Sequence, residues 1–317
     1  MFANPFKLKK LGILGMNKRN IHYIGAQNDR KYYPLVDNKL KTKVVAQNAN
    51  IAVPKLLVTI ERQSQLRNLE NMLIGLDKFV IKPAQGSGGK GILVIMKREG
   101  DEFIKPNGQR LQLKDIHRDI SNIISGLYSL GGKPDVAMIE TLVEFDPIFE
   151  RYSYEGVPDI RVIIYKGYPA MAMLRCSTRE SDGKANLHQG AVGVGIDMAS
   201  GKSLSSVQHG MPVTHHPDTG YDFSELEIPY WEKILTLAAS CYEVTHLGYL
   251  GVDIVLDKNL GPLILELNAR PGLAIQIANR VGAVKRYDVI DKQPEGLDVS
   301  DRVHFSMDHF GTNKINN

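Results

Sequence analysis

The sequence predicts a mixed α+β protein built mainly from short strands, and three observations support this fold class. Apolar runs of strand length recur from residue 54 to residue 268, bounded by glycine, proline and polar residues. The glycine-rich segment 84–91 joins one such run to the next, and a turn at 257–261 joins the last two as a hairpin. Segments with helical spacing are fewer and lie between the strands.

Four segments have the spacing of helices. Asp37 can cap a helix that carries Leu40 and Val44 and ends near residues 48–50. The other predicted helices are Glu61–Ile74, Lys114–Leu130 and Pro229–Thr245. Extended structure or strands are predicted for Pro54–Val58, Phe79–Lys82, Ile92–Lys97, Val136–Val143, Asp159–Tyr165, Ala170–Cys176, Ala191–Ile196, Gly251–Leu256 and Pro262–Asn268. No element is predicted after Arg286, where the chain is polar.

Composition excludes several classes of protein. With 43% hydrophobic and 23% charged residues, the chain is not disordered, collagen-like or a coiled coil. No apolar run approaches the roughly 18–20 residues of a membrane helix, and the N-terminus lacks the apolar core of a signal peptide. Two cysteines are too few for a disulfide framework or a zinc cage. These features predict a cytoplasmic protein without a transmembrane segment.

Charge is unevenly distributed along the chain. Residues 1–45 carry ten Lys and Arg against two Asp, a net charge of +8, so the remainder carries −4 of the overall +4. Such a segment suits a solvated face, nucleic acid, an anionic membrane surface or an acidic partner. Aromatic residues make up only 7% and do not interleave with arginine as base-stacking residues do. Nucleic acid is therefore not an expected partner.

The predicted hairpin brings two carboxylates together. If it folds about its midpoint, Asp253 lies opposite Glu266, and Asn268 shares their face because it is two residues further on. Two carboxylates and an amide oxygen are hard donors that suit Mg²⁺, whereas zinc would require His or Cys. The alternative is an acid pair that shares a proton, or a register that separates the two.

The glycine-rich segment is a candidate phosphate cradle. Glycines allow the backbone N–H groups to approach oxyanions closely. The spacing Gly86-x-Gly88-x-x-Gly91 formally matches a dinucleotide fingerprint, but that motif must open a helix, and here the segment joins strand to strand. The sequence therefore predicts a flap over phosphates, the alternative being a glycine-rich hairpin without a ligand.

Several remaining polar residues are ordinary on their own and gain meaning from their order. Arg175 ends a strand, Asn186 and His188 lie in the following loop, and Asp159 begins a strand. Together with Lys39 before a helix, Lys82 ending a strand, the glycine flap, Glu140 and the late hairpin, they resemble the ATP-grasp superfamily. The resemblance is closest to RimK-type α-L-glutamate ligase-like proteins and runs from Val36 to Ala283. Its sharpest segments are 159–161, 186–190, 251–254 and 266–273.

The resemblance implies a role for each matching position. ATP would be bound by Lys39, Lys82, the flap residues Gly86, Ser87, Gly88, Gly89 and Gly91, the adenine-edge residues Glu140, Thr141 and Leu142, the ribose contact Asp159, and Asn186. Asp253, Glu266 and Asn268 would hold one or two Mg²⁺ ions, or Mn²⁺ in their place. Arg175 and Arg270 are the catalytic candidates, which would stabilise an acyl phosphate and its tetrahedral successor.

The resemblance also implies a domain organisation and a reaction. A basic N-terminal segment (1–57) would precede an ATP lid domain (58–145), a larger sheet-based metal domain (146–285) and a polar tail (286–317). Only about 36 residues precede the first ATP-site helix, so the N-terminal domain usual in this superfamily is shortened, and a protein partner could complete the acceptor site.

The expected reaction is ATP-dependent carboxylate–amine ligation with amino-acid or peptide substrates, as in α-L-glutamate ligases. The alternatives are a non-catalytic ATP-binding regulatory module, or an ATP-grasp enzyme of envelope-sugar or peptide modification that works with a membrane partner.

Overall fold

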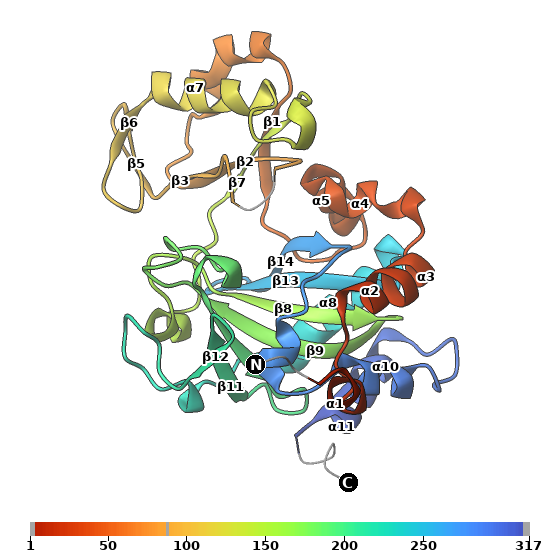
Figure 1. Ribbon diagram of the computed structural model, residues 1–317. Helices are drawn as coiled ribbons and strands as arrows, with labels where there is room; N and C mark the ends of the chain where they lie inside the picture. Colours follow the sequence, from red (N-terminus) through yellow and green to blue (C-terminus); the bar gives the residue numbers. More distant parts are fainter. Residues whose placement is uncertain (1–3, 87–88, 313–317) are drawn as a thin grey trace. The chain divides into compact units, whose positions relative to one another are not determined.

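The computed structural model describes residues 4–86 and 89–312, and the chain divides into two compact units. The large unit comprises Met1–Asp37, Val45–Ala52 and Phe145–Asn317, and the small unit comprises Asn38–Val44 and Val53–Glu144. Figure 1 shows the chain coloured along its sequence. Helix α5 (Lys39–Asn48) therefore contributes its first residues to the small unit and its last residues to the large one.

The small unit is a four-stranded antiparallel sheet with a second, three-stranded sheet and a covering helix. The first sheet has the order β1-β7-β2-β3 and the second the order β4-β5-β6. The strands are β1 (Leu56–Ile60), β2 (Phe79–Pro83), β3 (Leu93–Ile95), β4 (Lys97–Glu99), β5 (Glu102–Ile104), β6 (Arg110–Gln112) and β7 (Ala137–Thr141). Helix α7 (Leu113–Ile124) buries isoleucines at helical spacing, from Ile116 to Ile124, and contacts β2 and β7.

The large unit is built on a seven-stranded antiparallel sheet with the order β12-β11-β10-β9-β8-β13-β14. Its strands are β8 (Asp159–Tyr165), β9 (Tyr168–Cys176), β10 (Val192–Ile196), β11 (Ser203–Gln208), β12 (Met211–Val213), β13 (Tyr249–Asp257) and β14 (Gly261–Asn268). Every residue of β8 and β13 is buried, which explains their nearly continuous apolar sequence.

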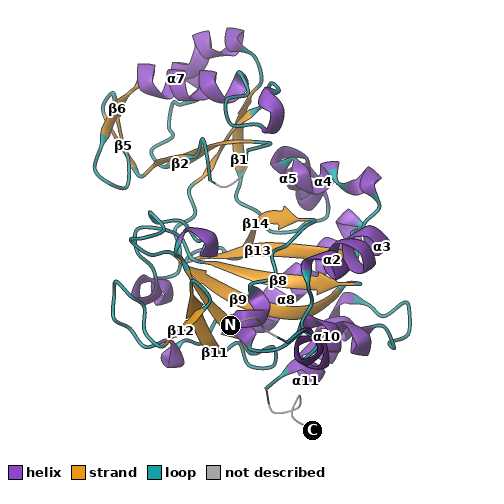
Figure 2. Cartoon of the chain, in the orientation of Figure 1, coloured by secondary structure: helices purple, strands orange, loops and turns teal. Residues whose placement is uncertain are grey.

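Helices cover the large sheet, as Figure 2 shows. Helix α8 (Trp231–Thr245) contacts β8, β9, β13 and β14, and α11 (Val299–Phe310) lies beside α8 and contacts β9. Helix α9 (Ile275–Asn279) packs on β10 at Gly193 and Gly195, where an added Cβ would collide with α9 or, at Gly193, with Leu187. Helix α10 (Ala283–Ile290) completes this part of the unit.

The N-terminal segment folds against the large sheet rather than forming a domain of its own. Its short helices are α1 (Pro5–Lys10), α2 (Met16–Lys18), α3 (Gly25–Gln27) and α4 (Pro34–Asp37). The Tyr23 ring packs among Tyr165, Tyr249 and Tyr287, with ring centroids 4.9–6.0 Å away. Residues far apart in sequence therefore anchor this segment through one buried aromatic cluster.

Most predicted strands are confirmed, and several other expectations are corrected. The helix expected at 114–130 ends at Ile124, and Asp37 ends α4, while Asn38 caps α5. The helix expected at 61–74 is a 3₁₀ turn (Gln63–Asn68) followed by the short helix α6 (Leu69–Met72), and the strand expected at 92–97 breaks between β3 and β4. The tail, for which no element was predicted, forms α11. Among the described residues, no helix has both the length and the apolar character needed to cross a bilayer.

Candidate functional site

A row of charged side chains crosses four neighbouring strands of the large sheet. In the ladder register, Arg175 of β9 lies opposite Asp159 of β8, and Arg161 of β8 lies opposite Asp253 of β13. Asp253 in turn lies opposite Glu266 of β14, so the predicted pairing is confirmed, and a β-bulge between Asp253 and Ile254 sets its register. Since Asp159 and Arg161 are two residues apart, all five side chains share one face of the sheet.

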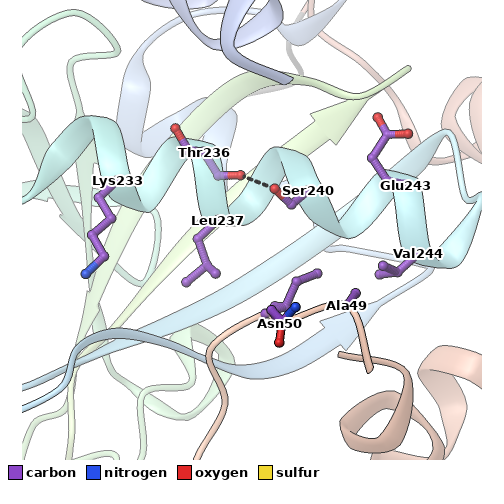
Figure 3. A pocket seen from close by; sticks show the side chains of 9 residues that line it. Ala49, Asn50, Lys233, Thr236, Leu237, Ser240, Glu243 and Val244 are labelled. Carbon is purple, nitrogen blue, oxygen red and sulfur yellow. Dashed lines mark hydrogen bonds between the residues drawn. The ribbon is translucent and has the colours of Figure 1, made fainter. Parts of the chain in front are cut away.

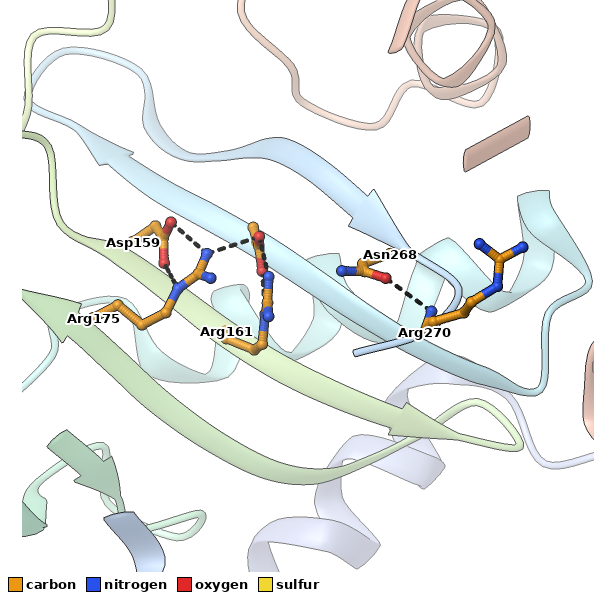
Figure 4. A network of polar contacts seen from close by, with 6 residues as sticks. Asp159, Arg161, Arg175, Asn268 and Arg270 are labelled. Carbon is orange, nitrogen blue, oxygen red and sulfur yellow. Dashed lines mark hydrogen bonds and ion pairs between the residues drawn. The ribbon is translucent and has the colours of Figure 1, made fainter. Parts of the chain in front are cut away.

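The row is held together by charge-assisted hydrogen bonds, several of which Figure 4 shows. Arg161 donates to both oxygens of Asp253, from Nε at 2.6 Å and from Nη2 at 2.5 Å. Nη2 of Arg175 donates to Asp253 at 2.8 Å and to Asp159 at 2.6 Å, and its Nε donates to the other Asp159 oxygen. Two buried carboxylates are thus balanced by two guanidiniums, the arrangement that buried charges require.

The two aspartates of the row differ in acidity. Burial would raise the pKa of Asp253, but Arg161 and Arg175 outweigh burial and lower it below its usual value. Burial raises the pKa of Asp159 to about 6, because Arg175 only partly offsets burial and the Asp253 charge adds to it. Asp253 is therefore the carboxylate that stays ionised over the wider pH range.

The side-chain oxygens at the end of the β13–β14 hairpin are of the kind that binds Mg²⁺. Glu266 and Asn268 are half-buried oxygen donors on one face, and Asn268 Oδ1 accepts a 2.8 Å hydrogen bond from the Arg270 backbone N–H. Asp253 accepts three hydrogen bonds from the arginines, which leaves about one of its roughly four lone-pair positions for a cation. Within residues 4–86 and 89–312, no group of three or more His, Cys, Asp or Glu side chains is arranged to hold a metal.

A second charged group lies inside the small unit and contains a residue that the sequence analysis missed. Glu140 lies 2.7 Å from Lys82 Nζ and 3.0 Å from Lys43 Nζ, and all three side chains are at most 8% exposed. Lys43 also donates to the Pro54 carbonyl oxygen. Burial lowers the pKa of Lys43, and the Glu140 carboxylate opposes this effect. The available signal was spacing: Lys43 is four residues after Lys39 and therefore on the same helix face.

Lys39, predicted as an ATP lysine, lies at the glycine-rich segment. Its backbone N–H donates to the Ala84 carbonyl at 2.8 Å, and its Nζ donates to the Gly86 carbonyl at 2.7 Å. The segment joins the antiparallel strands β2 and β3, so it opens a strand and not a helix. An added Cβ would meet Pro83 at Gly86 and the Tyr128 ring at Gly91.

Of the other predicted flap positions, Gly89 has a positive φ of +74° with open space where a Cβ would be. Ser87 and Gly88 lie outside the described residues.

The predicted adenine-edge residues lie at the end of β7. Glu140 pairs with both β1 and β2 and is an interior ladder residue, which is why its carboxylate reaches the two lysines. The Thr141 N–H donates to the Lys55 carbonyl at 2.9 Å. Leu142 follows the last residue of β7, so an adenine contact by backbone groups would fall at or beyond this position.

Asn186 has a structural contact that the sequence reasoning did not predict. It caps the short turn Leu187–Gln189, where its Oδ1 accepts a 3.0 Å hydrogen bond from the His188 N–H. His188 and Leu187 line a cavity of about 340 Å³ together with His209 and Ile277. None of the predicted site residues lines this cavity.

A further cavity of about 280 Å³ lies against α8 (Figure 3). Lys233, Thr236 and Leu237 line it from the helix, and Asn50 lines it from the end of α5. The Ser240 hydroxyl donates to the Thr236 carbonyl at 2.9 Å, a bond within the helix. The charged residues of its lining are Lys233 and Glu243, and none of the predicted site residues lines it.

Comparison with known proteins gives one family and a set of similar folds. The family model for sugar-transfer associated ATP-grasp proteins matches residues 18–292. Among solved structures, the chain is similar to the ATP-grasp ligase PsnB complexed with minimal precursor, with 13% identity, a TM-score of 0.45 and coverage of 84% of this chain and 63% of that one. The chain therefore spans less than two thirds of PsnB. No curated protein matches.

Two further solved structures have similar values. D-alanine–D-alanine ligase from Bacillus anthracis has 14% identity and a TM-score of 0.43 over 88% of this chain and 68% of that one. VanG D-Ala:D-Ser ligase from Enterococcus faecalis has 13% identity and a TM-score of 0.46 over 88% and 64%.

Proposed function

Because this chain belongs to the sugar-transfer associated ATP-grasp family, we propose that it is an ATP-dependent ligase that joins a carboxylate to an amine. The observation that carries the proposal is the charged row on the large sheet, which ends in the oxygen donors Glu266 and Asn268. Such a row supplies cations and metal-binding oxygens. Phosphoryl and acyl transfer can proceed with these groups alone, because positioning and electrostatics promote both reactions without a nucleophilic side chain.

The small unit would bind the nucleotide through its lysines and its glycine-rich segment. Lys82 and Lys43 are held by Glu140 in a buried group, and Lys39 is held at Gly86. The ammonium groups of Lys39 and Lys82, fixed in this way, would act as point charges for the phosphates of ATP. The backbone N–H groups of the glycine-rich segment would approach the same phosphates, and the end of β7 would meet the adenine edge.

The large unit would carry the transfer chemistry. Glu266, Asn268 and the remaining lone pair of Asp253 would hold Mg²⁺, which when bound supplies charge neutralisation at the phosphates. Arg175 uses Nε and Nη2 on the aspartates, so its Nη1 N–H groups remain for an acyl phosphate. Asp159 as the ribose contact and Asn186 as an ATP-site residue stay predictions.

The proposed reaction proceeds in two steps, through an acyl phosphate. A substrate carboxylate oxygen attacks the γ-phosphorus of ATP, and the bond to ADP breaks as the acyl phosphate forms. An amine then attacks the acyl carbon, phosphate leaves, and the amine loses a proton. Arg175 and Arg270 would stabilise the oxyanion that develops at the acyl carbon. The resemblance to glutamate ligases favours an amino acid or peptide as one substrate, and a protein partner that completes the acceptor site remains part of the proposal.

A specific observation favours modification at a membrane as a second candidate. The large apolar side chains that the basic N-terminal segment exposes include Phe6 (84%), Met16 (64%) and Ile21 (67%), which lie among Lys7, Lys9, Lys10, Lys18 and Arg19. Exposed apolar groups between cationic ones suit an anionic lipid surface. The ligase chemistry would then act on a substrate that is held at the membrane.

The deciding experiment measures ADP release with Mg²⁺ and ATP across amino acids, acidic peptides and amino sugars, followed by product masses. Glu266→Gln should abolish stimulated ADP release without unfolding the protein. Glu227→Gln, which removes a charge from the exposed pair with Lys202, is the matched control and should behave as wild type. If ATP raises the melting temperature but no mixture stimulates release above the ATP-only rate, the ligase proposal gives way to a regulatory ATP-binding module.

A further inference from the structure

A polar cavity of about 850 Å³ lies between the N-terminal segment and the residues that follow β14. Three arginines line it: Arg19 and Arg30 from the N-terminal segment, and Arg270 from the end of the hairpin. Asp29 is the one acidic residue of its lining. The cavity lies entirely within the large unit, and Arg270 is two residues beyond the proposed metal ligand Asn268.

The walls of this arginine cavity are fixed by buried hydrogen bonds. Asn28 donates to the carbonyl oxygens of Tyr249 and Ala269, at 2.7 and 3.2 Å, and accepts from the Tyr249 N–H at 2.9 Å. It thereby ties the N-terminal segment to the start of β13 and to the chain after β14. On another side, Arg19 Nη1 donates to the Pro271 carbonyl at 2.9 Å. A preformed wall lowers the entropic cost of binding a ligand.

The charges in the cavity are not balanced by its own acids. Asp29 is engaged by Lys31, whose Nζ lies 3.0 Å from its carboxylate. Arg270 stacks on Tyr33, 4.8 Å from the ring centroid, and lies 4.0 Å from Asp37 in a pair of which both members are more than half exposed. Exposed pairs at this distance are weak. Within the described residues, no ion pair or hydrogen bond engages the Arg30 guanidinium.

We infer that the arginine cavity binds the anionic group, carboxylate or phosphate, of the second substrate. Guanidinium groups recognise both anions through paired N–H donors, so the shared chemistry is a planar or tetrahedral oxyanion. The volume also accommodates the body of a small molecule beside the anion, with Tyr33 and Asn20 as polar or stacking contacts. The assignment of this ligand as the acceptor rests on the proposed function, whereas the anion site itself does not.

The experiment measures equilibrium binding by calorimetry in the absence of nucleotide. The probes are D-glucuronate for a carboxylate, glucose 1-phosphate and inorganic phosphate for a phosphate, and glucose as the uncharged match of glucuronate. Wild type should bind at least one anionic probe, more weakly as salt is added, and should not bind glucose. Arg30→Gln should weaken that binding about tenfold or more, the usual effect of losing one hydrogen bond to a charged group.

Arg280→Gln is the matched control, because it removes an exposed guanidinium of the same unit outside the cavity. It should bind the anionic probe as wild type does. Arg270→Gln is a second variant in the cavity, in case Arg30 contributes little to a particular probe. Equal affinity of wild type, Arg30→Gln and Arg270→Gln for every anion, or equal binding of glucose and glucuronate, would overturn the assignment.

The outcome is separable from that of the proposed function. If probe binding depends on Arg30 but the protein never releases ADP, the anion site is supported and the ligase proposal is refuted. If Arg30→Gln shows normal stimulated ADP release and an unchanged affinity for the substrate, the ligase proposal is supported and the anion site is refuted.

Discussion

Replacing Glu140 by Gln should destabilise the small unit strongly, because this carboxylate neutralises two buried lysines. Lys43 and Lys82 lie 3.0 and 2.7 Å from it, and their side chains are only 5% and 8% exposed. The variant keeps the volume of the side chain but leaves two ammonium groups in the interior without a counter-charge. Breaking a buried ion pair in this way costs about 3–5 kcal/mol of the free energy of unfolding.

The pH dependence of this loss gives a sharper test. Burial already lowers the pKa of Lys43 below 10.5, and the Glu140 carboxylate is what opposes it. Without the carboxylate, the pKa of Lys43 in the folded protein falls further, while in the unfolded chain it stays at its ordinary value. The unfolded state then binds more protons, so the stability of the variant rises with pH toward the alkaline range. The difference between wild type and Glu140→Gln should therefore shrink as pH rises from neutral toward 10.

Urea unfolding at several pH values measures this difference. Glu102→Gln is the control in the same unit, since it breaks an exposed pair with Arg110 and should change stability little at any pH. A Glu140→Gln protein as stable as wild type at neutral pH would refute the assignment of a buried charge triad. A large penalty that is the same at every pH would refute the role of lysine deprotonation.

Two further predictions concern other parts of the large unit. Burial lowers the pKa of His216 below 6.5, and its Nε2 donates to the Ser177 carbonyl at 3.0 Å. The stability of wild type relative to His216→Gln should therefore fall as pH drops below about 6.5, because the unfolded state takes up the proton first. A difference in unfolding free energy that does not change with pH would contradict this prediction. More wild-type protein should sediment with vesicles that contain anionic lipid than with neutral vesicles. The double variant Phe6→Ser/Ile21→Ser should sediment less, whereas Leu260→Ser, which removes another exposed apolar side chain, should sediment as wild type does. Equal sedimentation of wild type and both variants would exclude the N-terminal segment as a membrane contact.

The sequence was sufficient for the α+β ATP-grasp fold and for the pairing of Asp253 with Glu266 in the β13–β14 hairpin. Asp253 and Glu266 are close in sequence and joined by a tight turn, so the hairpin brings them to neighbouring positions on its two strands. The β-bulge between Asp253 and Ile254 produces this pair, because the register next to the turn, in which Ile254 faces Ile264, would place Asp253 opposite Leu265. The predicted pair is therefore confirmed, but the bulge that creates it was not predicted.

The partners of the hairpin were not predictable in the same way. Arg161 and Asp253 are 92 residues apart, and their pairing depends on the order of strands in the sheet, which the spacing of apolar residues does not determine. The role of Lys43 depends likewise on a contact with Glu140 on a distant strand. Helix α11 was missed because its buried residues, Arg302, Val303, Ser306 and Phe310, include polar ones that mask its inner face.

If Asp253, Glu266 and Asn268 hold Mg²⁺ as proposed, the charge balance of the row on the large sheet predicts that the ion binds together with ATP and not before it. Asp253 is already paired with Arg161 and Arg175 at 2.5–2.8 Å, so a cation at its last lone pair would lie near two guanidiniums. Asp159 and Asp253 balance the two guanidiniums, so the row would offer the single negative charge of Glu266 against the two positive charges of Mg²⁺. The phosphates of ATP would supply the missing negative charge. Mg²⁺ alone should therefore leave the melting temperature unchanged, Mg²⁺ with ATP should raise it more than ATP alone, and Arg161→Met should increase the affinity for Mg²⁺ in the absence of nucleotide. Tight binding of Mg²⁺ to wild type without nucleotide would refute this order, because it would require a cation site that the arginines do not oppose.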